Sequence, residues 1–126
     1  MAKRILIIDD HTAIRKMLVS MFANAGYEVV EADDGGTGLQ HAEVGGFDVI
    51  LLDMKMPQVD GLTFLKTIKQ TPPQNPNGPI IVFSSMDYTY VQQEALNNGA
   101  TAFITKDDLQ SVKLIQQVEA ILAREP

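Results

Sequence analysis

The chain has 126 residues, of which 45% are hydrophobic and 21% charged, a balance typical of one globular domain rather than of a disordered segment. It contains no cysteine, which excludes a disulfide framework, a thiolate metal site and a cysteine nucleophile. The net charge of −6 argues against direct binding of nucleic acid, because proteins that neutralise phosphates usually carry a basic patch.

The amino-terminal residues MAKRILIIDD lack the pattern of a signal peptide, because the apolar run between the basic start and the two acids is too short. No apolar run in the chain approaches the length that spans a membrane. We therefore expect a cytoplasmic protein without membrane association.

Short apolar runs alternate with segments of helical periodicity. The apolar runs predict five β-strands, over residues 5–8, 29–30, 49–52, 80–83 and 102–104. The periodic segments predict helices over 12–26, closed by Gly26, over 61–70, capped by Asp60, over 90–99 and over 109–124. Strand and helix alternate five times, which predicts an α/β fold with a parallel sheet and helices on both faces. The proline-rich stretch 70–79 is too short to divide domains, so we expect a single domain over residues 1–126.

Hydrophobic spacing within the helical segments predicts which side chains face the core. In the first segment these are Ile14, Met17, Leu18, Met21 and Phe22, and in the next they are Leu62, Leu65 and Ile68. In the last two segments they are Val91, Ala95 and Leu96, and then Val112, Ile115, Val118 and Leu122.

Polar residues follow four of the predicted strands. They are Asp9 and Asp10 after the first, Asp53 after the third, Ser84 at the fourth and Lys106 after the fifth. In open parallel sheets, ligands bind beyond the carboxyl ends of the strands, so we expect these side chains to meet at one edge.

The chemistry of this set points to phosphoryl transfer. Several close carboxylates repel one another unless a cation joins them, and hard oxygen ligands suit Mg²⁺. A carboxylate such as Asp53 can also act as a nucleophile toward phosphorus and form an aspartyl phosphate. Lys106 can balance the charge of the phosphoryl group, and Ser84 can donate its hydroxyl to a phosphoryl oxygen.

Each residue also has a plain structural explanation. Asp9 or Asp10 alone is best explained as a turn or helix-capping residue, Ser84 as a satisfied hydroxyl and Lys106 as a solvated charge. His11 beside a helix start is expected to cap the helix or lie on the surface, and His41 receives no role. These separate explanations do not account for the whole set, because chance would have to place all of these residues at the ends of four strands.

Four segments resemble, in order and spacing, the receiver domains of response regulators in two-component signalling, including the chemotaxis regulators. They are ILIIDDH with its acidic pair, DVILLDMKMPQVDGL around Asp53, IIVFSS with Ser84, and NNGATAFITK with Lys106. The resemblance covers essentially the whole chain. It implies a flavodoxin-like, doubly wound sheet of five parallel strands in the order 2-1-3-4-5, with five helices.

The resemblance also implies residue roles. Asp53 would accept the phosphoryl group, and Mg²⁺ would be held by Asp9, Asp10, Asp53 and the main-chain carbonyl of Lys55. Lys106 and Ser84 would contact the phosphoryl oxygens, and Ser84 and Phe103 would form the switch. In many receivers a proline follows the lysine through a cis peptide bond, whereas Asp107 follows here, so a trans bond is expected.

The implied partners are a sensor histidine kinase or phosphotransfer protein and an effector, or a second copy of the chain in the phosphorylated state. Docking is expected on the surface of the fourth helix, fifth strand and fifth helix, where Tyr88, Tyr90 and Phe103 are aromatic. The chain would be a switch that catalyses only its own phosphorylation and dephosphorylation.

Two other classes of protein do not fit the sequence. A phosphatase of the haloacid dehalogenase type needs a second acid two residues after its nucleophile, and Lys55 occupies that position. A flavodoxin needs a Ser/Thr-rich phosphate loop after the first strand, which is missing. Two alternatives remain open: a receiver that belongs to a longer regulator with a separate output domain, for example a DNA-binding one, and a docking module that acts without phosphorylation.

Overall fold

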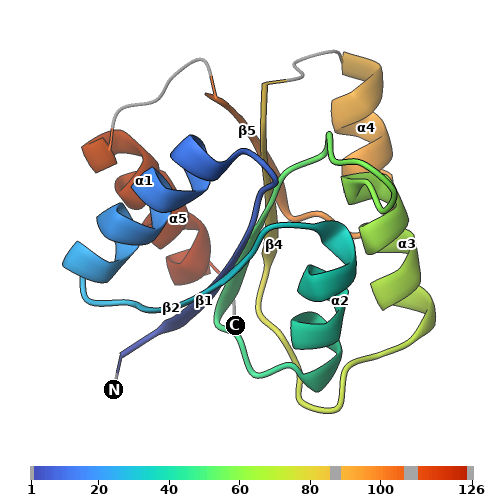
Figure 1. Cartoon of the computed structure of the whole chain (residues 1–126), viewed down its shortest axis with the longest axis horizontal. Helices are drawn as coiled ribbons and strands as arrows, with labels where there is room; N and C mark the ends of the chain where they lie inside the picture. The colour runs from blue at the N-terminus through green and yellow to red at the C-terminus, as the bar shows by residue number, and fades with distance from the viewer. Residues whose placement is uncertain (1, 86–88, 107–110, 125–126) are drawn as a thin grey trace.

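Figure 1 shows the computed structural model, which describes residues 2–85, 89–106 and 111–124. Within these residues, five strands alternate with five helices. The elements are β1 (Arg4–Ile8), α1 (Thr12–Asn24), β2 (Glu28–Ala32), α2 (Gly35–Val44), β3 (Val49–Leu52), α3 (Gly61–Gln70), β4 (Ile80–Ser84), α4 (Thr89–Asn97), β5 (Ala102–Thr105) and α5 (Ser111–Arg124).

The strands form one sheet in the order β2-β1-β3-β4-β5, and every neighbouring pair is parallel. Helices α1 and α5 cover one face, and α2, α3 and α4 cover the other (Figure 1). The predicted fold class and strand order are therefore confirmed. Each predicted strand is found with its ends extended by at most two residues, the largest change being in β2.

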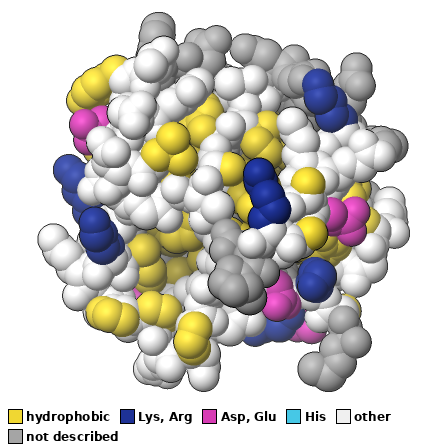
Figure 2. All heavy atoms as spheres, turned by 180° about the vertical axis from the view of Figure 1, so that it is seen from behind, with side chains coloured by type: hydrophobic (Ala, Val, Ile, Leu, Met, Phe, Trp, Pro, Cys, Tyr) yellow, Lys and Arg dark blue, Asp and Glu magenta, His cyan; other side chains and the backbone are white. Residues whose placement is uncertain are grey.

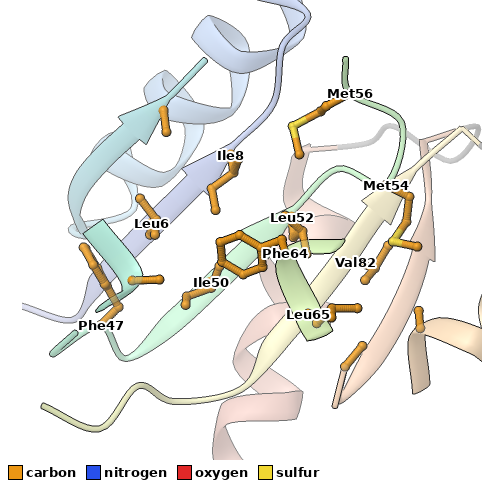
Figure 3. Close-up of a cluster of buried hydrophobic side chains, with 14 residues drawn as sticks. Leu6, Ile8, Phe47, Ile50, Leu52, Met54, Met56, Phe64, Leu65 and Val82 are labelled. Carbon is orange, nitrogen blue, oxygen red and sulfur yellow. The ribbon is translucent and has the colours of Figure 1, made fainter. Parts of the chain in front are cut away.

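Two hydrophobic clusters lie on opposite faces of the sheet, because successive side chains of a strand point to opposite sides. Leu6 and Ile8 of β1 join the cluster beneath α2, α3 and α4, whereas Ile5 and Ile7 join the cluster beneath α1 and α5. Figure 3 shows the first cluster, with Phe64 of α3 among its labelled side chains. All four residues of β3 are buried, which explains its uninterrupted apolar sequence.

Three predicted helix ends are confirmed. Asp60 caps α3, where its Oδ1 accepts a 2.8 Å hydrogen bond from the Thr63 amide. His11 caps α1 in the same manner, with its Nδ1 accepting a 3.4 Å bond from the Ile14 amide. Gly26 follows the end of α1 with φ of +94°, a left-handed conformation that favours glycine.

Some core predictions were wrong. Met17 is 38% exposed, because the buried stripe of α1 runs through Arg15, Leu18 and Phe22 rather than through Met17. Leu96 of α4 is also exposed, and of the three residues predicted on its face only Ala95 is fully buried.

In α5, the fully buried residues are Leu114, Val118 and Ile121, so the helix is rotated by about one residue from the predicted phase. Ile115 and Leu122 pack at the margin of the core, half-buried. The side chains of Tyr88 and Val112, the expected helix start at Leu109 and the bond from Lys106 to Asp107 lie outside the described residues.

The loop before β4 is fastened to the turn between α2 and β3. The side chain of Asn77 accepts a 3.1 Å hydrogen bond from the Phe47 amide and donates a 3.0 Å bond to the Ala42 carbonyl. The proline-rich stretch therefore forms a loop whose Asn77 is hydrogen-bonded to α2 and to the residue two before β3. Across the described part of the chain, none of the helices has the length and apolar character needed to span a membrane.

Candidate phosphoacceptor site

Strand register places Asp9 and Asp53 side by side at the carboxyl edge of the sheet. Ile8 pairs with Leu52, and each acid is the next residue of its strand. Main-chain hydrogen bonds continue past the strand ends: the Asp53 amide donates to the Ile8 carbonyl at 3.0 Å, and the Asp9 amide donates to the Ala32 carbonyl at 3.1 Å. The sheet itself thus fixes the two acids in the middle of the rim.

The predicted cluster of carboxylates is present. One oxygen each from Asp9, Asp10 and Asp53 lies within 4.8 Å of the other two. Asp9 and Asp53 are 2% and 5% exposed, whereas Asp10 is open to solvent. Asp9 also serves the turn, because its Oδ1 accepts a 2.8 Å hydrogen bond from the His11 amide. The structural explanation for Asp9 therefore holds together with membership of the cluster.

Lys106 brings a buried positive charge to these acids. Its Nζ donates a 2.7 Å hydrogen bond to Asp9 Oδ2 and lies 3.6 Å from Asp53 Oδ1, while its side chain is only 9% exposed. The ammonium group also lies 5.9 Å above the ring of Phe83. Lys106 is thus a member of the site and not a solvated surface charge.

Burial raises the pKa of the Asp53 carboxyl from 3.8 to about 6; the nearby charge of Lys106 opposes this, and that of Asp9 adds to it. The Lys55 amide lies 3.4 Å from Asp53 Oδ1 and also favours the ionised form. Above neutral pH the carboxyl is therefore mostly ionised, which is the form that can bind a cation or attack phosphorus.

Ser84 and Phe103 lie on β4 and β5, the two strands that follow β3 in the sheet. Ser84 ends β4 fully buried and pairs with Thr105, the residue before Lys106. Phe103 pairs with Val82 and packs, half-buried, against the cluster beneath α2, α3 and α4. The structure therefore brings Ser84 to the rim, whereas Phe103 stands on β5 below it.

The set of donors fits a hard divalent cation. Three carboxylates supply oxygen ligands within a span of 4.8 Å, and the exposed Asp10 leaves a side open for water. Lys106 balances only part of this negative charge, so a small oxygen-binding cation such as Mg²⁺ suits the cluster.

Arg15 belongs to the site's surroundings and was missed in the sequence. Its buried guanidinium donates a 3.0 Å hydrogen bond from Nη1 to the main-chain carbonyl of Asp9. A signal existed: Arg15, Leu18 and Phe22 recur at i, i+3 and i+7, so a charged residue occupies a core position of α1.

Comparison with known proteins agrees with this geometry. Residues 5–119 match the family described as the response regulator receiver domain. The chemotaxis protein CheY of Bacillus subtilis is 37% identical over 107 residues, which cover 84% of this chain and 87% of that protein. Some relatives are far longer: the chain spans 15% of a sensor kinase/phosphatase and 45% of a transcriptional regulatory protein.

Solved structures show the same fold. A CheY-like receiver domain from Methanospirillum hungatei JF-1 superposes with a TM-score of 0.87 at 30% identity, covering 98% of this chain and 95% of that one. The CheX–CheY–BeF₃–Mg²⁺ complex from Borrelia burgdorferi gives a TM-score of 0.83 at 27% identity, covering 94% and 88%.

A flavodoxin-like sheet with an acidic pair, a third carboxylate and a lysine at its carboxyl edge defines the class of protein as a receiver domain. The chain belongs to the response regulator receiver domain family of two-component signalling. Members of this family are switches rather than conventional enzymes.

Proposed function

We propose that Asp53 accepts the phosphoryl group, from a phosphohistidine on a sensor histidine kinase or a phosphotransfer protein. The observation that carries this proposal is the meeting of three carboxylates with one buried ammonium group, that of Lys106. Asp53 is the one acid of the cluster that is both buried and at the end of the central strand β3.

In the reaction, an oxygen of Asp53 forms a bond to phosphorus while the phosphorus–nitrogen bond of the donor breaks and imidazole leaves. Lys106 pairs with the developing negative charge, and the hydroxyl of Ser84 donates to a phosphoryl oxygen. We propose that the chain catalyses only its own phosphorylation and dephosphorylation.

Asp9, Asp10, Asp53 and the main-chain carbonyl of Lys55 are the proposed ligands of Mg²⁺. When bound, the ion offsets the charge of the carboxylates and of the phosphoryl oxygens. The CheY of Borrelia burgdorferi has been captured with BeF₃ and Mg²⁺, which supports the same chemistry here. Asp10→Ala is expected to lose both Mn²⁺ binding and phosphorylation, and full phosphorylation in a chelator would contradict the metal assignment.

The phosphoacceptor is tested by incubation with a small phosphodonor and Mg²⁺, followed by intact-mass measurement. One phosphoryl mass is expected on the wild-type chain and none on Asp53→Asn. Asp60→Asn is a matched control, because it removes an exposed acid of the same loop while asparagine still caps α3. Equal labelling of Asp53→Asn would overturn the assignment.

The output surface is proposed to lie on α4, β5 and α5. The edge strand β5 lies between these helices, and hydrophobic side chains are exposed across this face (Figure 2). Tyr90 is 72% exposed. A hollow of about 530 Å³ beside β5 is lined by Ile104, Gln117, Ala120, Ile121, Ala123 and Arg124.

We propose that movement of Ser84 and Phe103 changes this surface for an effector protein or for a second copy of the chain. We also propose that the chain is a single receiver domain over residues 1–126. We expect it to act in the cytoplasm and to make no direct contact with nucleic acid. In a longer regulator, the same surface would act on an adjoining domain. If the chain were a docking module that needs no phosphorylation, Asp53→Asn would bind the effector as well as the phosphorylated wild type does. A pull-down that compares the two proteins distinguishes this alternative from the switch.

A further inference from the structure

Arg15 is buried without belonging to the carboxylate cluster. It is 7% exposed, and the only other polar or charged residues buried to this degree in the described ranges are Asp9, Asp53 and Ser84. Burying a guanidinium costs free energy unless it is paired and hydrogen-bonded, so the partners of Arg15 indicate which part of the structure it stabilises.

The guanidinium of Arg15 joins two strands at the base of the site. Nη1 donates a 3.0 Å hydrogen bond to the main-chain carbonyl of Asp9, and Nε donates a 2.9 Å bond to Oε1 of Glu31 in β2. The planar group presents its donors in a fixed fork, so both bonds are made in one orientation.

A second contact fixes the same point of the chain. The Asp9 amide donates to the carbonyl of Ala32, the residue after Glu31. The amide of Asp9 is therefore bonded directly to β2, and its carbonyl is bonded to Arg15 of α1, which is itself held by Glu31 of β2. The carboxylate of Asp9 contacts Lys106. Glu31 also accepts a hydrogen bond from Lys16, whose Nζ lies 3.0 Å from Oε1 and whose side chain is exposed.

We propose that Arg15 is a positioning residue which, anchored by Glu31, fixes the turn carrying Asp9 and Asp10 in the orientation that binds a divalent cation. The inference rests on the proposed function for its metal and goes beyond it, because the bond from Arg15 to Asp9 is made to the main-chain carbonyl and not to the carboxylate that would hold the ion. Partners that orient metal ligands typically affect metal affinity by about 10–100-fold when they are lost.

Replacement of Arg15 can be accommodated by the fold. A hollow of about 220 Å³ beside the guanidinium is lined by Arg15, Glu31, Ala32, Asp33 and Thr37. Because four of the five lining residues carry polar groups, water can occupy the space left by a shorter side chain and bond to the Asp9 carbonyl. Arg15→Gln is therefore a suitable variant.

The experiment measures Mn²⁺ affinity by electron paramagnetic resonance on the full chain, well below the unfolding temperature, with folding checked by circular dichroism. Arg15→Gln is expected to weaken Mn²⁺ binding by about 10–100-fold, and Glu31→Gln by several-fold through loss of the anchor. Lys16→Gln is the matched control, because it removes the exposed partner of Glu31 and leaves the Arg15 bond to Asp9; its affinity should stay within about twofold of wild type.

A role confined to fold stability would lower the unfolding temperature and leave the affinity of the folded protein unchanged. Wild-type affinity in folded Arg15→Gln overturns the inference, while the proposed function stands as long as the wild type binds Mn²⁺ and labels on Asp53. If Arg15→Gln does not fold, Glu31→Gln decides: weakened binding supports the inference and unchanged binding refutes it. A wild-type chain that bound no Mn²⁺ would refute the proposed metal site and this inference together.

Discussion

Lys106 donates its hydrogen bond to Asp9 and not to Asp53: Nζ lies 2.7 Å from Asp9 Oδ2 but 3.6 Å from Asp53 Oδ1. The ammonium group is therefore held beside Asp9, one of the proposed metal ligands, and about 1 Å beyond hydrogen-bonding distance of the proposed phosphoacceptor. A cation that takes over the Asp9 oxygen would release Lys106 toward Asp53. The pairing thus links metal binding to the placement of the charge that phosphoryl transfer requires.

Lys106→Gln is expected to destabilise the metal-free protein. It leaves two buried carboxylates without their cation, and breaking a buried ion pair by removal of one partner costs about 3–5 kcal/mol. The variant should also lose phosphorylation by about 100-fold or more, because one charged contact to the transferring group is gone. Urea unfolding at pH 7.5 in a chelator and the rate of labelling measure the two effects. Lys66→Gln, at an exposed position of α3, serves as the control, and equal stability of the two variants would contradict the pairing.

Asp53→Asn is expected to stabilise the metal-free protein at neutral pH. Burial raises the folded-state pKa of Asp53 from 3.8 to about 6, so the folded protein binds this proton more tightly than the unfolded chain. The resulting stabilisation of the wild type is complete below about pH 4 and is lost as pH rises through about 6. Asparagine does not ionise, so the variant keeps the free energy of unfolding, about 3 kcal/mol, that the wild type loses when Asp53 ionises.

The difference in unfolding free energy between Asp53→Asn and wild type should therefore grow from pH 4 to pH 7.5 in a chelator. Urea titrations across this pH range measure the difference. Addition of Mg²⁺ should make the difference smaller, because the ion stabilises only the wild type. Glu43→Gln, an exposed acid of α2, should follow the wild-type curve. A difference independent of pH would show that the carboxyl of Asp53 ionises with an ordinary pKa.

Sequence patterns predicted most of the fold because the three central strands, β1, β3 and β4, are buried along almost their whole length and read as short apolar runs. Asp53 was recognisable for the same reason, as a charge that directly follows such a run. Helix phase was harder to predict. In α5, hydrophobic residues lie on more than one face, and only packing against the sheet decides that Leu114 and Ile121 are buried while Leu122 is half-buried.

Contacts between distant residues could not be predicted in detail. Asp9 and Lys106 are 97 positions apart, and their 2.7 Å contact depends on strand order and on the path of the chain after β5. Sequence patterns place both residues at one sheet edge but do not show which acid the lysine prefers. The bond from Arg15 to the Asp9 carbonyl was hidden for a different reason, since a main-chain partner leaves no trace in residue type.

Two glycines of α2 give opposite predictions for the same substitution. A Cβ at Gly38 would lie 2.7 Å from Cδ1 of Ile8 and 2.9 Å from its Cγ1, whereas a Cβ at Gly36 would meet only an Asp34 oxygen, at 3.5 Å. Gly38→Ala is expected to lower the unfolding free energy by about 1–3 kcal/mol through overpacking against β1. Gly36→Ala should raise it by about 0.5–1 kcal/mol, because alanine favours the helix. Chemical denaturation compares the two, and stabilisation of both would mean that α2 does not approach β1 this closely.

The last prediction concerns the response of the output surface to a phosphate mimic on Asp53. Beryllofluoride with Mg²⁺ adds negative charge and acceptor atoms at the rim, to which the buried hydroxyl of Ser84 can donate. Ser84 pairs with Thr105 in β5, so its displacement acts directly on the strand that carries Phe103. Phe103 is only half-buried, which leaves its ring free to pack more deeply once space opens beside β4.

Two-dimensional NMR on the full chain should therefore show shifts on adding beryllofluoride that extend from the rim through α4 and β5 into α5, including Tyr90 and Phe103. Asp53→Asn should show none of them under the same conditions, since it lacks the carboxylate that binds the mimic. Ser84→Ala should keep the shifts around Asp53 and lose those in α4 and α5, because the mimic still binds while the hydroxyl that would move residue 84 toward it is gone. Shifts confined to the rim in the wild type, with residues 89–97 and 113–115 unmoved, would exclude this route to the surface. A Ser84→Ala variant that retained the distant shifts would place the coupling elsewhere, most directly in the exchange of Lys106 between Asp9 and Asp53.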